Sequence, residues 1–227
     1  MNQYILRVKK NYKNENSPIC YIYGLDYYKT YKEEEDEFSK KMNHFYKYGE
    51  NQQFFLEKLS DLYNLRFKND SIKFDYLSLY PTHKKDCVNP NMRKLSLKLC
   101  NNIGIEFRQI IRRTKTIKQM HTLGSYEERM KNVKGSIELI ENVKDKNILL
   151  FDNATITGIS LMLANEYLLK HGVRYVACLC LGLGYKEKEQ DWKDLNIKMK
   201  HSDVVEKIKS PYVPKDKYEK YKSEHSE

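Results

Sequence analysis

The most restrictive feature of the sequence is an apolar run, Ile148-Leu149-Leu150-Phe151, that leads directly into Asp152 and a loop rich in hydroxyl residues. An uninterrupted apolar run is typical of a strand buried on both faces of a parallel sheet. After the loop, apolar residues recur at helical spacing between Thr157 and Lys170, and Gly172 ends the pattern. The segment therefore predicts a strand, a loop and a helix, together with a parallel sheet that contains the strand.

Strand and helix patterns alternate between residues 71 and 184. Residues 74–80 form a short apolar run that Pro81 ends, and residues 173–181 form another buried strand. A helical pattern precedes Gly104, whereas residues 112–134 are basic and almost aperiodic, which favours a long mobile loop followed by a short helix over residues 127–130. The alternation predicts an α/β fold whose parallel sheet is covered by helices on both faces.

The 227 residues divide into three expected regions. Residues 1–70 predict an N-terminal appendage, or hood, with two short strands and two helices. Residues 71–184 predict the α/β core, and residues 185–227 predict a charged C-terminal extension that is helical or partly loose. The extension is a candidate contact to a second copy of the chain or to another protein.

Charge is concentrated in one part of the chain. The formal net charge is +10, and residues 82–134 alone hold 13 Lys and Arg against four Asp and Glu, a net of +9. A mildly basic soluble surface explains this balance without any partner, whereas a local positive field would attract nucleic acid or a polyphosphate ligand. Few aromatic residues interleave with these bases, which favours phosphate over stacked bases.

Cysteine usage and hydropathy exclude several classes of protein. The five cysteines contain no Cys-x-x-Cys pair, so we expect neither a disulfide scaffold nor a zinc ribbon, and a reducing, cytoplasmic setting is the natural expectation. No apolar run approaches the roughly 18 to 20 residues that a membrane-spanning helix needs, so we expect no membrane partner.

The loop after the buried strand carries groups that suit a sugar phosphate. Asp152 could accept hydrogen bonds from ribose hydroxyls, and the loop amides with the following helix N-terminus favour a phosphate. The hydroxyls of Thr155, Thr157 and Ser160 add donors, while Gly158 allows close backbone approach. The alternative is an ordinary turn between strand and helix in which Thr157 caps the helix.

At these residues the segment resembles the phosphoribosyl-pyrophosphate (PRPP) loop of type I phosphoribosyltransferases, in which four apolar residues and two acids precede a short loop ending in Thr-Gly-x-Thr/Ser. Three more segments resemble motifs of the ComF branch of that family, in the same order: Tyr80-Pro81-Thr82-His83, Thr116-Ile117-Lys118-Gln119 and Glu128-Arg129-Met130-Lys131-Asn132-Val133-Lys134-Gly135. The resemblance covers residues 75–181. It implies the type I phosphoribosyltransferase fold with a small hood.

The resemblance also implies roles for individual residues. The first acid of the family's pair, which binds ribose, falls on Asp152, and the second position of this catalytic pair falls on Asn153. The 5′-phosphate would be held by the loop residues Thr155, Ile156, Thr157, Gly158 and Ser160. Pyrophosphate with Mg²⁺ would be bound after the early strand by Thr82, His83 and Lys84, and a flexible loop with Arg112, Arg113 and Lys115 would close over it. The metal itself receives no direct protein ligand in this assignment.

The implied function is a phosphoribosyltransferase of nucleotide metabolism that breaks the C1–O bond of PRPP, transfers phosphoribosyl to an unknown acceptor and releases pyrophosphate. Two departures from the family pattern put turnover in question. Asn153 replaces the second acid, and Ile156 stands near the position of the Asp that hypoxanthine-type enzymes carry. The alternative is therefore a regulatory or nucleic-acid-associated protein, of DNA uptake or bacterial defence, that uses the fold without turnover and binds nucleic acid through residues 82–134.

Overall fold

A seven-stranded sheet forms the centre of the protein. The computed structural model describes residues 4–11, 16–29, 36–68, 73–185 and 192–193. The strands in chain order are β1 (Ile5–Lys9), β2 (Cys20–Tyr28), β3 (Tyr76–Leu79), β4 (Glu106–Phe107), β7 (Asn147–Thr155), β8 (Tyr175–Gly184) and β9 (Trp192–Lys193). Their order in the sheet is β4-β3-β7-β8-β2-β1-β9. The five strands from β4 to β2 are parallel, and β1 and β9 are antiparallel additions at one edge.

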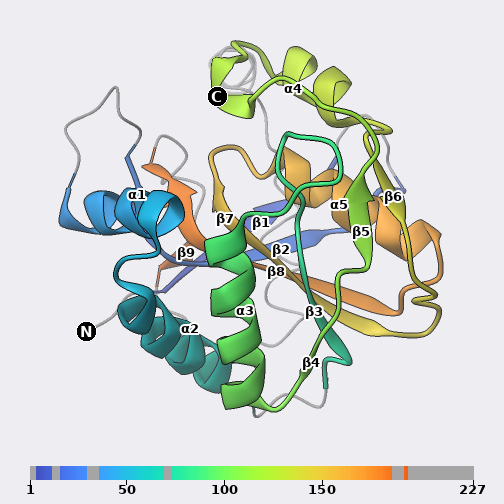
Figure 1. Ribbon diagram of the computed structural model, residues 1–227. Coiled ribbons are helices and arrows are strands. Elements are labelled where there is room, and N and C mark those ends of the chain that lie inside the picture. The colour runs from blue at the N-terminus through green and yellow to red at the C-terminus, as the bar shows by residue number, and fades with distance from the viewer. Residues whose placement is uncertain (1–3, 12–15, 30–35, 69–72, 186–191, 194–227) are drawn as a thin grey trace, which may run out of the picture.

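Helices cover both faces of this sheet (Figure 1). On one face lie α1 (Glu37–Tyr48), α2 (Gln52–Arg66) and α3 (Pro90–Ile103), and their apolar residues share one core cluster with β3, β7 and β8. The other face carries α5 (Ile159–Lys170), which shares a second cluster with the two-stranded antiparallel sheet of β5 (Ile111–Arg113) and β6 (Ile137–Leu139). The α/β fold with a mostly parallel sheet and helices on both faces is confirmed. No described helix is long and apolar enough to cross a membrane.

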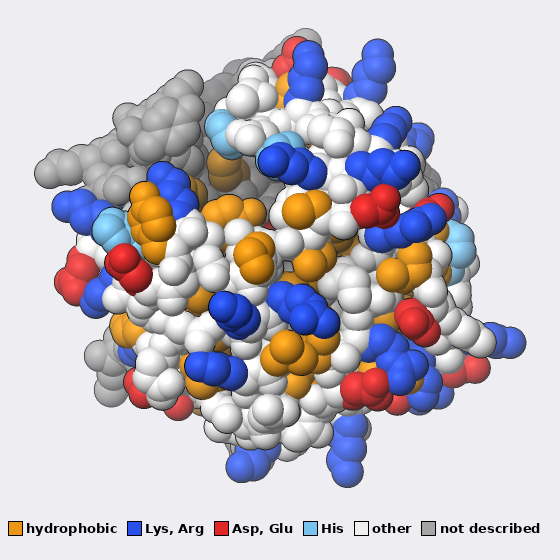
Figure 2. Space-filling model, viewed as in Figure 1, with side chains coloured by type: hydrophobic (Ala, Val, Ile, Leu, Met, Phe, Trp, Pro, Cys, Tyr) orange, Lys and Arg blue, Asp and Glu red, His pale blue; other side chains and the backbone are white. Residues whose placement is uncertain are grey.

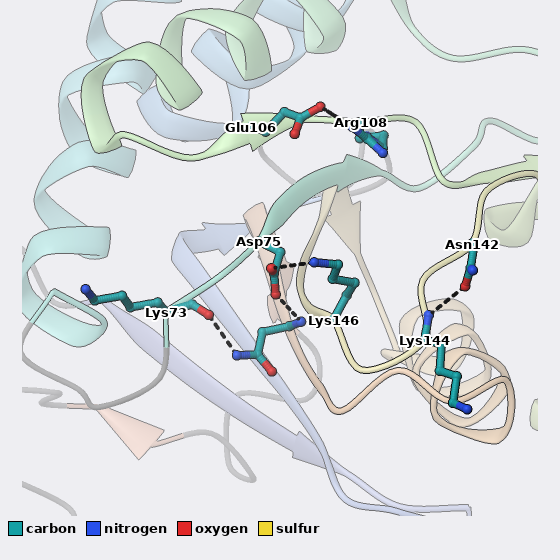
Figure 3. A network of polar contacts seen from close by, with 8 residues as sticks. Lys73, Asp75, Glu106, Arg108, Asn142, Lys144 and Lys146 are labelled. Atoms are coloured by element: carbon teal, nitrogen blue, oxygen red, sulfur yellow. Dashed lines mark hydrogen bonds and ion pairs between the residues drawn. The ribbon is translucent and has the colours of Figure 1, made fainter.

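The apolar run 148–151 is fully buried at the centre of the sheet, as its composition predicts. Two core clusters bury its alternate side chains, which is why no polar residue interrupts the run. At the amino end of this strand, Asp75 accepts hydrogen bonds from the Lys146 ammonium at 3.1 Å and from the Asn147 amide at 2.8 Å (Figure 3). These bonds fix the start of β3 and β7, so that both strands deliver their last residues to the same edge.

The N-terminal 70 residues do not stand apart from the core. Strand β2 pairs in parallel with β8, so the region expected as a separate hood contributes β1 and β2 to the central sheet. Helices α1 and α2 then pack on one face of that sheet. Apart from Tyr185 and the backbone of β9, the expected extension 185–227 lies outside the described residues.

The prediction of a loop followed by a short helix over residues 112–134 was right for the helix but missed the strand at the start of the segment. The segment contains the end of β5, a 3-10 turn (Met120–Thr122) and helix α4 (Tyr126–Val133), which is longer than the predicted 127–130. Strand β5 alternates buried, exposed and buried, but its second buried residue is Arg113 rather than an apolar one. A buried arginine therefore hid the period-two pattern that identifies a strand.

Candidate functional site

A cleft of about 360 Å³ opens at the carboxyl ends of β3 and β7. This edge of an open parallel sheet is where such folds bind ligands. Five segments contribute its walls: the end of β7 with the following loop, the end of β3 with the following loop, the region from β5 to α4, helix α1, and the end of β2. The lining includes Asp152, Asn153, Thr155, Ile156, Thr157, Ser160, Tyr80, Pro81, Thr82, His83, Arg113, Gln119, His121, Arg129, Tyr28, Met42, Asn43 and Tyr46.

Asp152 provides a carboxylate on the floor of the cleft. One of its oxygens accepts a hydrogen bond from the Asn153 amide at 2.8 Å, and no described group donates to the other. Burial raises the pKa of Asp152 to about 7, against the smaller opposing effects of that hydrogen bond and of the Arg113 charge. A carboxyl group with this pKa accepts hydrogen bonds from ligand hydroxyls above pH 7 and donates one below it.

The loop between β7 and α5 leaves several backbone amides free. Helix α5 begins at Ile159, its N-cap is Gly158 with φ of 76°, and no side chain caps it. The turn capped by Thr157 is therefore not what forms. Instead the Thr155 hydroxyl accepts from the Gly158 amide at 2.9 Å, while no described group accepts from the amides of Ile156 and Thr157. Free amides beside a helix N-terminus form a site for an anion.

Arg113 dominates the opposite wall of the cleft. Its guanidinium is buried and donates to the carbonyls of Pro81 and Thr82, at 3.2 and 3.0 Å, and to the Ser136 hydroxyl at 2.5 Å. These bonds hold the β3 loop in place while the charge still lines the cleft. The Arg113 guanidinium carbon also lies 5.0 Å from the centre of the Tyr80 ring, and the buried Tyr80 hydroxyl has no hydrogen-bond partner among the described residues.

Further basic and polar side chains complete this wall. His83 lies 3.4 Å from Gln119 between their side-chain nitrogens, and His121 and Arg129 line the same space. Burial, then the charges of Lys84, Arg113 and His121, lowers the pKa of His83. Arg129 donates twice to the Leu123 carbonyl, at 3.1 and 2.9 Å, which fixes α4 against the preceding turn. Figure 2 shows Lys and Arg side chains over the upper part of this face, around α4.

The structure brings most of the predicted site residues together, but not all. Asp152, Asn153, Thr155, Ile156, Thr157, Ser160, Thr82, His83 and Arg113 line one cleft. Lys84 and Lys115 are exposed and do not line it. Arg112 points elsewhere, since it pairs with Glu138 and, at 3.8 Å, with Asp86. Gly158 is buried behind the loop rather than in the cleft.

Helix α1 and the end of β2 supply a wall that sequence reasoning missed. Tyr28, Met42, Asn43 and Tyr46 line the cleft, and the Tyr28 hydroxyl donates to the Asn43 side chain at 3.2 Å. Burial, and then the negative charge of Asp152, raises the pKa of Tyr46. Met42 follows the helical spacing of core residues, so its pattern does not indicate a binding site. Among these wall residues, only the neighbouring polar residues Asn43 and Tyr46 could have indicated one in the sequence.

Comparison with known proteins gives distant structural likenesses only. No family model matches the sequence, and no curated protein matches it. A hypoxanthine-guanine phosphoribosyltransferase from Bacillus anthracis is 12% identical over 60% of this chain and 69% of that chain, with a TM-score of 0.37. A hypoxanthine phosphoribosyltransferase from Staphylococcus aureus is 12% identical over 60% and 65%, at 0.38. A hypothetical protein from Neisseria gonorrhoeae with bound ppGpp is 11% identical over 70% and 71%, at 0.37. Identities and TM-scores this low do not assign the chain to a family.

Proposed function

We propose that the cleft binds PRPP and that the chain is a type I phosphoribosyltransferase-like protein of the ComF-like branch, which transfers phosphoribosyl to an acceptor and releases pyrophosphate. One observation carries the proposal. A single cleft holds a carboxylate and an amide side chain between two anion-binding ends, the free amides of the 155–160 loop on one side and the Arg113 wall on the other.

The spacing of charge in the cleft matches the chemistry of a sugar with phosphate groups at both ends. Ribose hydroxyls would donate to the Asp152 oxygen that has no described partner, and the Asn153 side chain would supply a neutral second contact. The 5′-phosphate would accept from the amides of Ile156 and Thr157. The departing pyrophosphate would lie against Arg113 and His83, where the Arg113 charge and the N–H donors of both side chains would stabilise the developing negative charge.

Magnesium would arrive with the pyrophosphate. A protein site for Mg²⁺ commonly supplies one or two carboxylates, with phosphate oxygens and water completing the coordination. The described residues contain no cluster of three metal-binding side chains, and the Asp152 oxygen without a described partner is assigned to ribose, so pyrophosphate oxygens and water would hold the cation, with the Asp152 carboxylate lining the same cleft. When bound, the cation would neutralise charge on the leaving group. Arg113 and the walls of the cleft would orient the pyrophosphate and exclude water.

A second candidate function is a regulatory protein that binds PRPP or a related nucleotide without turnover. Asn153 favours it, because an amide brings no charge to a magnesium-bound substrate. Ile156 favours it as well, since its side chain offers no base and packs toward Gly184. Nucleic acid would bind through the basic residues of the 82–134 segment in this alternative.

Two measurements separate these proposals. Calorimetric titration with PRPP and Mg²⁺ should show binding in the wild-type protein. In D152N the affinity should fall about tenfold or more, because the charged acceptor is lost. In D75N, which alters an Asp at the amino ends of the strands and away from the cleft, the affinity should not change. Pyrophosphate release with a pool of candidate acceptors then distinguishes the transferase from the regulatory protein. Unchanged PRPP affinity in D152N would remove the ribose contact and with it the proposed site.

A further inference from the structure

A fully buried arginine lies behind the anion-binding loop. Arg7 belongs to β1, two strands away from β8, yet its guanidinium reaches across the sheet. It donates to the carbonyls of Ile156 at 2.6 Å, Gly184 at 2.8 Å and Thr155 at 3.5 Å. A buried charge is costly unless hydrogen bonds compensate for it, so the loop and the end of β8 must keep their carbonyls turned toward this side chain.

Two glycines allow the loop to lie close to its neighbours: Gly158 to the N-terminal strands and Gly184 to the end of β8. A Cβ atom on Gly184 would stand 2.7 Å from the Ile156 Cα, and one on Gly158 would stand 2.9 Å from both the Ile22 Cδ1 and the Lys9 Cγ. Backbone at the first position cannot move aside cheaply. The loop is therefore closely fitted against β1 and β2 through Gly158 and against the end of β8 through Gly184.

The carbonyls that Arg7 holds determine where the neighbouring amides point. In a planar trans peptide, the C=O of one residue and the N–H of the next face opposite directions, and the described chain contains no cis bond. The carbonyls of Thr155 and Ile156 face Arg7, so the amides of Ile156 and Thr157 face away from it. These are the two loop amides without a described acceptor, and both residues line the cleft.

We propose that Arg7 is a positioning residue of the anion site: by binding the carbonyls of Thr155 and Ile156, it aims the amides of Ile156 and Thr157 at the phosphate of the ligand. This inference rests on the proposed function for the identity of the ligand, but the orientation itself is a property of the free protein. The N-terminal strand thus becomes part of the binding site without contacting the ligand.

The test compares three variants with the wild-type protein. R7K keeps the charge but cannot hold three carbonyls with the planar fork of a guanidinium. G184A leaves the charge in place and displaces Ile156 instead. R66K is the matched control, since Arg66 donates to the Tyr23 hydroxyl at 3.2 Å, on the opposite face of the sheet from the loop. Far-ultraviolet circular dichroism establishes whether each variant is folded. If R7K does not fold, G184A still tests the proposal, because it displaces Ile156 without removing Arg7.

Three probes are titrated: ribose 5-phosphate, pyrophosphate and inorganic phosphate, with the backbone amide resonances of residues 156–160 followed by NMR. We expect R7K and G184A to shift the free-protein resonances of Ile156 and Thr157 and to weaken ribose 5-phosphate binding about tenfold, the effect of losing one well-aimed donor to a charged group. Pyrophosphate affinity and all properties of R66K should stay within twofold of wild type. A purely structural role for Arg7 would instead weaken both ligands alike.

The outcomes separate this inference from the proposed function. Equal ribose 5-phosphate affinity in wild type and R7K, or unchanged loop resonances in R7K and G184A, overturns the role of Arg7 alone. If wild type fails to bind PRPP but inorganic phosphate still shifts the loop amides, and R7K abolishes that shift, Arg7 keeps its role and the proposed function fails. If phosphate perturbs none of these amides in the wild type, both statements fall.

Discussion

Replacing Asp152 with Asn should stabilise the protein relative to wild type, by an amount that grows as the pH rises from about 4 to about 7. Burial raises the pKa of Asp152 to about 7, whereas in the unfolded chain the carboxyl titrates near its ordinary value of 3.8. Between these two values the folded protein holds a proton that the unfolded chain has released. The contribution of this proton to the free energy of unfolding therefore falls as the pH rises from about 4 to about 7. Above the folded pKa that contribution is gone. D152N, which cannot ionise, lacks this dependence.

The size of the effect follows from the shift. Each pH unit in that window changes the free energy of unfolding by about 1.36 kcal/mol, so two units between pH 5 and pH 7 give an upper limit of about 2.7 kcal/mol. The Asp152 side chain is partly exposed to the cleft, and water there reduces the penalty. We therefore expect D152N to gain about 1 to 2 kcal/mol on wild type between pH 5 and pH 8.

Urea denaturation of both proteins at pH 5, 6, 7 and 8 measures this difference directly. Using the difference between the two proteins cancels the titration of groups that they share, the histidines included. The reasoning is refuted if the stability difference is the same at pH 5 and pH 8, or if it changes in the opposite direction. Either result would place the Asp152 carboxylate in a solvated or ion-paired setting rather than on the floor of a cleft.

Four further predictions test other parts of the structure. D75N should show the opposite pH dependence, because the Asn147 amide, with Lys146, lowers the pKa of Asp75 from its ordinary value of 3.8. It should lose about 1 kcal/mol at pH 7, and this loss should shrink as the pH falls below 3.8 in a urea series extended to pH 3. R113M leaves the carbonyls of Pro81 and Thr82 without their hydrogen-bond donor, so it should lower the free energy of unfolding by about 3 kcal/mol in urea denaturation and abolish pyrophosphate binding in calorimetry. R112M, which alters a side chain outside the cleft, should change neither quantity. G182A places a Cβ 2.7 Å from that of Tyr28 and 2.8 Å from the Met42 sulfur, so it should displace the α1 wall and weaken PRPP binding while pyrophosphate binding, measured in parallel, stays unchanged. PRPP affinity should rise between pH 6 and pH 8 as Asp152 ionises, and a D152N protein with the same rise would contradict that cause.

The sheet and its principal loop could be predicted from the sequence because their signals are local. The run 148–151 is apolar at every position since both faces of β7 are buried, and Pro81 and Gly104 end their elements where the structure ends them. The four segments that resemble phosphoribosyltransferase motifs in sequence also meet around one cleft: Thr82, Gln119, Arg129 and Thr157 all line it.

The missed features depend on contacts between distant residues. Strand β5 was hidden because its inward residue, Arg113, is charged and is compensated by carbonyls of another loop. The same reason hid Arg7, whose partners lie almost 150 residues or more away. Arg112 and Arg113 are adjacent in sequence and look alike there, yet the alternation of the strand sends one into the cleft wall and the other to Glu138.

The most direct test of the central claim is a competition titration. Wild-type protein is saturated with PRPP and Mg²⁺ in a calorimeter, and ribose 5-phosphate and pyrophosphate are then each used to displace it. A cleft with two anion-binding ends predicts that either fragment alone competes, and that the two bind together without excluding each other. Failure of PRPP to bind, or displacement by only one of the two fragments, would contradict the account.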